Sequence, residues 1–162
     1  MARTYLGNYE EAAEILSAAI RTCEEQHYRD LLGSVTNKQG EVRLMQRRMN
    51  AAAGLYRRSL ALKDTLNEKQ RSEALFGLAL ALSYMDSTAA AIVLLEAGIG
   101  RALVQEYEIT NHLLLSRFLR RAGRLEDALT SLSKVEEQIW KTGSINQKLF
   151  AVFELSASCR AA

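Results

Sequence analysis

Small and apolar residues recur along this chain with the spacing of one face of an α-helix. Segments 7–20 and 123–135 share one arrangement: a glycine, an aromatic residue or leucine two positions later, an alanine three positions after that, and then apolar residues at helical intervals. This periodicity is typical of amphipathic helices. Because the arrangement occurs in two separate places, it also indicates a repeat architecture.

The pattern predicts an all-α chain of about eight helices. No proline interrupts it, and the strong helix formers Ala, Leu, Glu and Arg are frequent. Asn8 and Asn67 are placed to cap helix starts, and Gly123 is placed to end a helix in a left-handed turn. The expected helices span residues 9–26, 30–46, 50–64, 69–84, 88–104, 107–121, 125–140 and 145–159.

Two weaker copies of the arrangement lie between the two clear ones. An alanine marks the same position in all four copies, at intervals of 40, 39 and 37 residues by subtraction: Ala12, Ala52, Ala91 and Ala128. Twelve residues before the last three markers the chain again has small residues: Gly40, Ala79 and Ser116. A close helix crossing requires small side chains, because a large one would push the helices apart. We therefore expect these positions to be buried.

With these markers the chain resembles the tetratricopeptide repeat (TPR) family, whose helix–turn–helix units stack into a superhelix. The resemblance covers about residues 1–142 and implies a right-handed α-solenoid of antiparallel helix pairs. The intervals exceed the roughly 34 residues usual in the family. The chain therefore resembles elongated members, such as kinesin light chains, spindle-orientation adaptors and the solenoid arms of some bacterial transcription activators, and the sequence does not single out one of them. We expect a single TPR-like domain over residues 1–162, either whole or a piece of a longer array.

Charge and composition narrow the range of partners. The 162 residues carry a formal net charge of only +2, although basic residues dominate segment 38–63 and acidic residues dominate segment 1–28. A basic segment can attract nucleic acid phosphates, but a solvated helix face is the simpler interpretation, so nucleic acid is not an expected partner. No apolar run reaches the roughly 20 residues that span a bilayer. We expect no membrane partner, a cytoplasmic location, and two core cysteines, Cys23 and Cys159.

No motif points to catalysis or to a cofactor. The sequence has no P-loop, no Gly-x-Gly-x-x-Gly, no His-Glu-x-x-His and no Cys-x-x-Cys. Glu24 and His27 have the Glu-x-x-His spacing of di-iron bundles, but such centres need a second copy and two further carboxylates. His112 stands where the repeat packs its helices, so we expect a partly buried, hydrogen-bonded ring. The expectation is a protein that is not an enzyme and binds neither a metal nor a cofactor.

The TPR resemblance implies a concave groove lined by the first helix of each repeat. The candidate peptide-binding residues on that face are Asn37, Lys38, Glu41, Phe76, Leu80, Tyr84, Leu113, Arg117, Arg120 and Arg121. The same face includes Leu44, Met45, Gly77, Ser83 and Leu114. An apolar stripe beside arginines favours an acidic, amphipathic peptide, since guanidinium groups bind carboxylates bidentately. The predicted function is a non-catalytic scaffold that binds a protein or peptide.

Two other functions stay open at this point. The chain could be the ligand- or partner-sensing arm of a larger transcription regulator or signalling protein, or, with less support, a metal-binding helical bundle. The last expected helix also carries apolar residues that nothing later in the chain covers: Leu149, Phe150, Val152 and Phe153. Uncovered apolar surface is typical of an interaction site, so we expect self-association through terminal helices.

Overall fold

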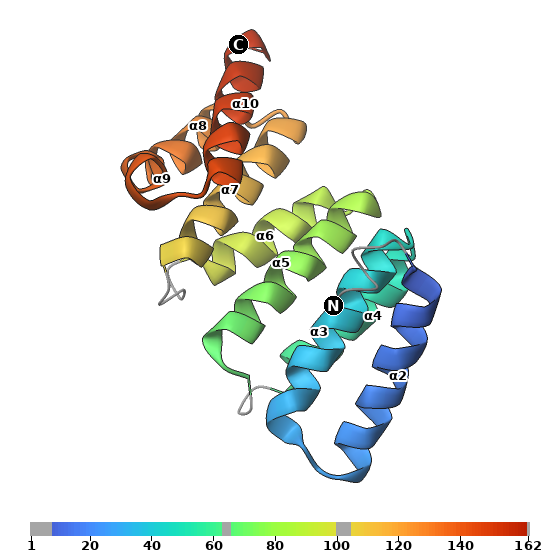
Figure 1. Ribbon diagram of the computed structural model, residues 1–162. Helices are drawn as coiled ribbons and strands as arrows, with labels where there is room; N and C mark the ends of the chain where they lie inside the picture. Colours follow the sequence, from blue (N-terminus) through green and yellow to red (C-terminus); the bar gives the residue numbers. More distant parts are fainter. Residues whose placement is uncertain (1–7, 63–65, 100–104, 162) are drawn as a thin grey trace. The chain divides into compact units, whose positions relative to one another are not determined.

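The computed structural model describes residues 8–62, 66–99 and 105–161, without the side chains of 105, 106 and 159–161 (Figure 1). The described residues form nine α-helices and no strand, which confirms the all-α class. The helices group into two compact units, Met1–Asp86 and Ser87–Ala162, here called unit 1 and unit 2. The single domain expected over residues 1–162 stays a prediction.

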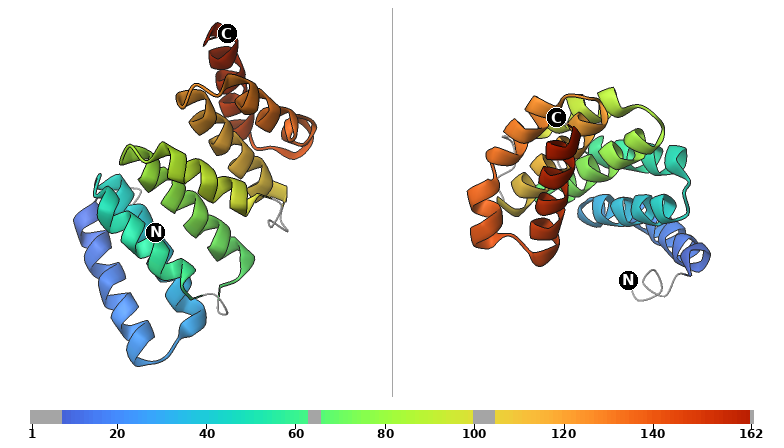
Figure 2. Two further views of the ribbon diagram at one scale, coloured as in Figure 1. Left: turned by 180° about the vertical axis from the view of Figure 1, so that it is seen from behind. Right: turned by 90° about the horizontal axis from the view of Figure 1, so that it is seen from above.

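Unit 1 contains four of the described helices. They are α2 (Tyr9–Glu25), α3 (Arg29–Met45), α4 (Met49–Leu60) and α5 (Glu68–Tyr84). Consecutive helices pack against each other, and α3 also contacts α5. Figures 1 and 2 show them as neighbours that run in alternating directions. As a result α3 and α5, which are separated in sequence by α4, contact each other directly. We call this line of contact the α3–α5 seam.

Unit 2 contains the remaining five helices. They are α6 (Thr88–Gly98), α7 (Gln105–Arg121), α8 (Leu125–Ser133), α9 (Glu136–Thr142) and α10 (Ile145–Ala161). The last helix, α10, packs against α7, α8 and α9. Its seam with α7 corresponds to the α3–α5 seam of unit 1. The expected helix ends at residues 64 and 104 lie outside the described residues, and α4 and α6 end earlier, at Leu60 and Gly98.

The expectation of one helix over 125–140 is wrong, because α8 stops at Ser133 and α9 starts at Glu136. The Ser133 hydroxyl donates to the Thr130 carbonyl at 2.9 Å, a local bond that competes with helical pairing. Val135 then leaves the helical conformation, with φ −119° and ψ 3°. Its side chain is 1% exposed in the core of unit 2, so the break is fixed by packing.

The repeat markers are buried as expected. Ala12 is 6% exposed, and the other three marker alanines are fully buried. The small residues twelve positions before the markers, Gly40, Ala79 and Ser116, are buried as well. The sequence pattern therefore located the close helix crossings correctly.

The turns between paired helices share a left-handed residue. Gly123 has φ +78°, which confirms the predicted helix stop, and Arg47 and Asp86 adopt the same region at φ 58° and 56°. Each stands five residues before its marker alanine. The residue after Arg47 donates its N–H to the Arg43 carbonyl at 2.8 Å, and Arg124 donates likewise to Leu119 at 2.9 Å. These bonds are those of a Schellman motif, so the weaker repeats use the same turn without a glycine.

Other local expectations are also met. Asn8 accepts the N–H of Glu11, and Asn67 forms a capping box with Gln70 at 2.9 and 3.0 Å. Cys23 is a buried free thiol, whereas the side chain of Cys159 lies outside the described residues. Among the helices that the structure describes, none is long and apolar enough to cross a membrane.

Candidate functional site

A cavity of about 280 Å³ lies in unit 1 beside the α3–α5 seam. We call it the α3–α5 cavity. Ten residues line it: Asn37, Lys38, Glu41, Leu44, Met45, Tyr56, Glu73, Phe76, Gly77 and Leu80. Eight of them were placed on the groove face by the sequence, and only Tyr56 and Glu73 were not. The structure therefore brings together predicted residues from two helices that lie about a whole repeat apart in the sequence.

Tyr56 of α4 holds the seam at a fixed width. Its ring is 3% exposed and lies against both α3 and α5. A Cβ added to Gly40 would lie 2.8 Å from a ring carbon, and one added to Gly77 would lie only 2.1 Å away. Because the interior is close-packed, neither position has room for a side chain while the ring stays in place. Of these three residues, Tyr56 and Gly77 line the cavity.

The lining also contains polar groups, and one of their acceptors has no partner among the described residues. Asn37 is 3% exposed, and its Nδ2 donates to the Gln70 carbonyl at 2.7 Å. Its Oδ1 is buried with no hydrogen-bond partner. Lys38 Nζ lies 3.0 Å from Glu41 Oε2 in an ion pair one turn along α3. A buried acceptor without a donor is costly, so this lining is suited to a ligand that donates a hydrogen bond.

The electrostatics of the cavity are set by two carboxylates. Burial raises the pKa of Tyr56 well above its usual value, and the negative charges of Glu41 and Glu73 raise it further. Both carboxylates therefore act on the same buried phenol. Lys38 pairs with Glu41, whereas no ion pair joins Glu73 to any residue that the structure describes. The cavity thus has two acidic groups against one basic group.

Two other predicted groove residues lie elsewhere. Tyr84 is 57% exposed, one turn beyond Leu80 on α5, and it does not line the α3–α5 cavity. Leu113 is 4% exposed and packs in the core cluster of unit 2 with Ile109 and Leu132. Leu113 is therefore a core residue, because the helix face expected to form the groove is covered here by the unit's own side chains.

The three arginines of α7 are not equally available. Arg120 Nε donates to Glu154 Oε2 at 2.8 Å, and a second contact of 3.4 Å joins its other nitrogen to Oε1. This pair raises the pKa of the Arg120 guanidinium. The guanidinium of Arg117 lies 5.7 Å from the centroid of the Phe150 ring. Arg121 is exposed at the end of the helix. The α7–α10 seam therefore uses much of the basic charge that the sequence assigned to a ligand.

Some of the unevenly distributed charges of the sequence pair with each other inside unit 1. The acidic α2 and the basic residues that follow α3 form cross-helix ion pairs, Glu10 with Arg48 at 3.1 Å and Glu24 with Arg58. Glu24 is thus engaged by an arginine, and His27 is exposed in the turn that ends α2, with φ 56°. No group of three or more His, Cys, Asp or Glu side chains able to hold a metal occurs within the described ranges.

His112 is buried and hydrogen-bonded, as expected. Its ring is 3% exposed, and its Nδ1 lies 3.0 Å from Ser131 Oγ. The Ser131 hydroxyl donates to the His112 carbonyl at 3.2 Å, so Nδ1 is the donor in the ring contact. Burial lowers the pKa of His112, Lys134 lowers it further, and Glu108 opposes the shift. Its burial and its contact with Ser131 make this ring part of the packing between α7 and α8.

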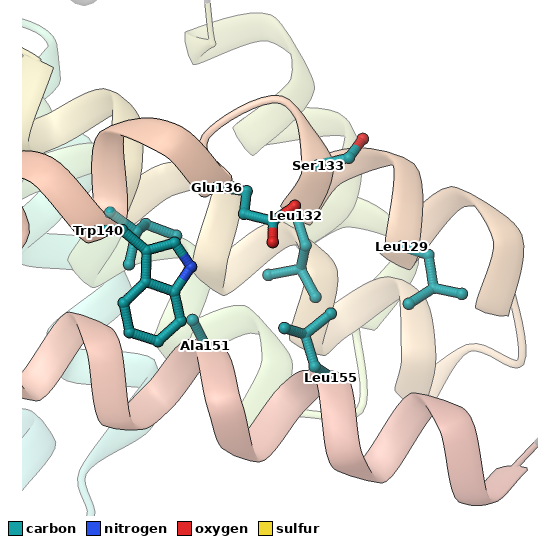
Figure 3. A pocket seen from close by; sticks show the side chains of 8 residues that line it. Leu129, Leu132, Ser133, Glu136, Trp140, Ala151 and Leu155 are labelled. Atoms are coloured by element: carbon teal, nitrogen blue, oxygen red, sulfur yellow. The ribbon is translucent and has the colours of Figure 1, made fainter.

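A second apolar hollow lies in unit 2 between α8, α9 and α10. Its volume is about 240 Å³. Figure 3 shows Leu129, Leu132, Ser133, Glu136, Trp140, Ala151 and Leu155 around it. Trp140, which lines it, is 50% exposed, and Leu149 and Phe153 of α10 are 62% and 60% exposed. The expected exposure of Leu149, Val152 and Phe153 is confirmed, whereas Phe150 is partly buried against the core.

Sequence reasoning missed three residues that shape these sites. Tyr56 was recognised only as a core position, although two glycines 37 residues apart, Gly40 and Gly77, were a signal of a bulky neighbour. Glu73 and Glu154 gave no signal, because an acidic residue on a helix is ordinarily solvated. Only the packing shows that Glu154 is 1% exposed and that Glu73 faces a cavity.

Comparison with known proteins supports the fold. No family model matches the sequence, and no curated protein matches it. Two crystal structures of TPR-like repeats from a Podosopora anserina protein described as a kinesin light chain do match, one of them a point variant. The variant aligns with a TM-score of 0.81 over 99% of this chain and 81% of that chain. The other aligns with a TM-score of 0.79 over 99% and 82%.

Sequence identity to both structures is 19%, so the similarity concerns the fold. The chain has the TPR-like helical-repeat fold that its markers indicated. Folds of this kind generally serve as protein-binding scaffolds.

Proposed function

We propose that this chain is a non-catalytic scaffold that binds a peptide segment of a partner protein in the α3–α5 cavity. One observation carries the proposal: two helices of adjacent repeats converge on a cavity that has both apolar walls and an unsatisfied hydrogen-bond acceptor. Sites of this composition are typical of specific recognition, since apolar walls supply affinity and a few polar groups supply orientation. A cytoplasmic location stays a prediction from the sequence.

The cavity and its surroundings suit a peptide anchored by one side chain. Phe76 and Leu80 are partly buried along α5 and offer an apolar wall. Tyr84 continues the same helix face outside the cavity and offers exposed aromatic surface. A peptide would place one side chain against Phe76 and Leu80 and a neighbouring one against Tyr84. Aromatic residues are frequent among the contacts that dominate binding energy.

The acidic residues expected in the partner would bind to arginines of α7 in unit 2. Arg120 is already paired with Glu154, and Arg117 packs over Phe150. Arg121 is the most exposed of the three. Because Arg121 is exposed, an acidic part of the partner would reach it, and the outer edge of Arg117, most easily. The replacement of both by alanine should slow association and reduce its salt dependence, because exposed charges act mainly on the encounter rate.

Selection from a phage-displayed library of random peptides tests the proposal. Peptides selected on the full chain should lose at least tenfold in affinity on a Leu80→Asp variant, because a carboxylate replaces an apolar wall. The Tyr84→Ala change should weaken the same peptides by about 1–2 kcal/mol. Isothermal titration calorimetry measures both effects, and circular dichroism checks that the variants fold.

The matched control is Val93→Asp, which introduces the same charge on α6 at a residue that is 65% exposed. It should leave affinity unchanged. If the selected peptides bind the parent and the Leu80→Asp variant equally well, the α3–α5 cavity is not the peptide site.

We also propose that α9 and α10 mediate contact with a second copy of the chain. Exposed apolar side chains protrude from α10, and a two-fold interface would bury such a face against its copy. Val152 is 50% exposed and Phe153 is 60% exposed on α10. Sedimentation velocity over a concentration series should show a dimer that Phe153→Glu dissociates and Val93→Glu does not. A parent chain that stays monomeric at high concentration would overturn this proposal.

A further inference from the structure

The polar groups of the α3–α5 cavity are mostly acceptors. Asn37 Oδ1 is buried without a partner, and Glu73 has no ion pair with any described residue. Glu41 shares its charge with Lys38 across 3.0 Å. A ligand that enters this cavity therefore meets two carboxylates and a carbonyl oxygen, with one ammonium group already engaged.

We propose that the group bound in the α3–α5 cavity is cationic, namely a lysine or arginine side chain of the partner peptide. This inference rests on the proposed function and adds the charge of the anchoring residue. The aliphatic stem lies along Phe76 and Leu80, and the charged end donates hydrogen bonds to the Glu73 carboxylate and to Asn37 Oδ1.

The chemistry of the two side chains matches each part of the cavity. Lysine and arginine side chains carry three or more hydrogen-bond donors and no acceptor. They can therefore donate to several acceptors of the cavity without bringing in an acceptor that lacks a donor. Their apolar stems bury well against hydrophobic side chains while the charge stays at a polar edge. The partly buried ring of Phe76 would add cation–π attraction.

An acidic or purely apolar anchor fits less well. A carboxylate would face Glu41 and Glu73, and like charges disfavour each other most strongly in a partly desolvated site. An apolar anchor would avoid that repulsion but would leave Asn37 Oδ1 buried without a donor. The acidic partner expected from the sequence therefore does not extend to this cavity, and a single partner would need charges of both signs.

Three capped peptides of one length test the inference. They have the sequence Ala-Leu-X-Leu-Ala, with arginine, glutamine or glutamate at X, and each is titrated into the ¹⁵N-labelled full chain. Amide chemical shifts of α3 and α5 report binding in the cavity. The arginine peptide should bind about tenfold more tightly than the glutamine peptide, because a charge-assisted hydrogen bond replaces a neutral one. The glutamate peptide should bind most weakly.

Two variants of the chain show whether a preference for arginine comes from the cavity or from general electrostatic attraction to the protein. Glu73→Gln should remove most of the preference for arginine over glutamine while leaving the affinity for the glutamine peptide unchanged. Glu25→Gln is the matched control, because Glu25 is an exposed residue at the end of α2 that does not line the cavity. It should leave the preference intact.

The outcomes distinguish this inference from the proposed function. If all three peptides shift the cavity resonances with equal affinity, the cavity binds peptides but does not select a cation, and the inference alone falls. The inference falls in the same way if the glutamate peptide binds most tightly. If no peptide shifts those resonances, the proposed peptide site falls and the inference falls with it.

Discussion

The two equivalent seams of the molecule, α3–α5 in unit 1 and α7–α10 in unit 2, are held by opposite chemistry. In unit 1 the buried ring of Tyr56 fits against two glycines. In unit 2 the buried carboxylate of Glu154 pairs with Arg120. Both seams join first helices of adjacent repeats, so the repeat geometry requires close contact but does not specify how it is made.

The difference determines which charges are left for a partner. The aromatic contact of unit 1 uses no charged group, and Glu73 lines a cavity without an ion pair to any described residue. The ionic contact of unit 2 uses Arg120, and the nearby Arg117 packs over Phe150. The arginine-rich helix that looked like a ligand site is therefore partly structural, whereas the seam without arginines holds the stronger candidate site.

The largest effect is expected from a substitution that disrupts the packing of Tyr56 in the α3–α5 seam. Gly77→Val would place its Cβ where the Tyr56 ring lies, since even the first carbon would come within 2.1 Å of it. We expect a loss of about 3 kcal/mol in the free energy of unfolding, as is typical of overpacking. Urea unfolding followed by circular dichroism measures it. Adding Tyr56→Leu should recover part of the loss, because the two sites are in contact.

A glycine elsewhere in the same unit is the control. Nothing lies within 4 Å of a Cβ placed on Gly54 of α4. Gly54→Ala should therefore stabilise the helix by about 0.5–1 kcal/mol. If Gly77→Val is as stable as the parent chain, the ring does not fix the seam.

The next largest effect is expected from removing the ion pair between Arg120 and Glu154 in the α7–α10 seam. Glu154→Gln keeps the shape of the side chain but removes the charge opposite Arg120, and it should cost about 2 kcal/mol. Trp140 is the only tryptophan in the sequence, so its fluorescence during urea unfolding reports unit 2. Replacing both Arg120 and Glu154 by methionine should cost much less than the single change, because no buried charge is left alone. Equal losses in the two variants would contradict the pairing.

A smaller effect is expected in how the stability of unit 2 depends on pH. The pKa of His112 in folded unit 2 lies below its ordinary value of 6.5, so the unfolded chain takes up the proton more readily. The stability of unit 2 should therefore be constant above that value and decrease as the pH falls below it, until the folded-state pKa is reached. Trp140 fluorescence during urea unfolding at several pH values measures this. His112→Asn should flatten the profile in that window, and an unchanged profile would rule out His112 as its source.

The smallest effect concerns the shared turn rather than the seams. Arg47 has φ 58°, where a side chain is strained and glycine is not. Arg47→Gly should therefore raise the stability of unit 1 by about 0.5–1 kcal/mol. Arg57→Gly, within α4, is the control and should lower it by about 1 kcal/mol. Chemical denaturation with circular dichroism compares the two, and a loss of stability in Arg47→Gly would mean that the side chain is needed in the turn.

Local sequence patterns were sufficient to find the helices and their crossings. The alanines at positions 12, 52, 91 and 128 are buried because the helix period of 3.6 residues leaves only one face for the crossing. The same periodicity placed Asn37, Lys38, Glu41, Phe76 and Leu80 on one face, and the structure gathers them in one cavity. It missed the break between α8 and α9, because Val135 leaves the helix to satisfy packing that only the folded unit provides.

By itself, then, the sequence determined the all-α class, the repeat register, the helix crossings and the face that carries the α3–α5 cavity. These properties depend on periodicity and residue size, which are local. Only the tertiary structure decided which charges are free and which are used internally. Glu10 and Glu24 pair with arginines far along the chain, Arg120 pairs with Glu154, and Glu73 has no ion pair within the part of the chain that the structure describes. Charge pairing depends on distances of a few ångströms between residues more than 30 positions apart, and no periodic pattern in a single chain encodes those distances.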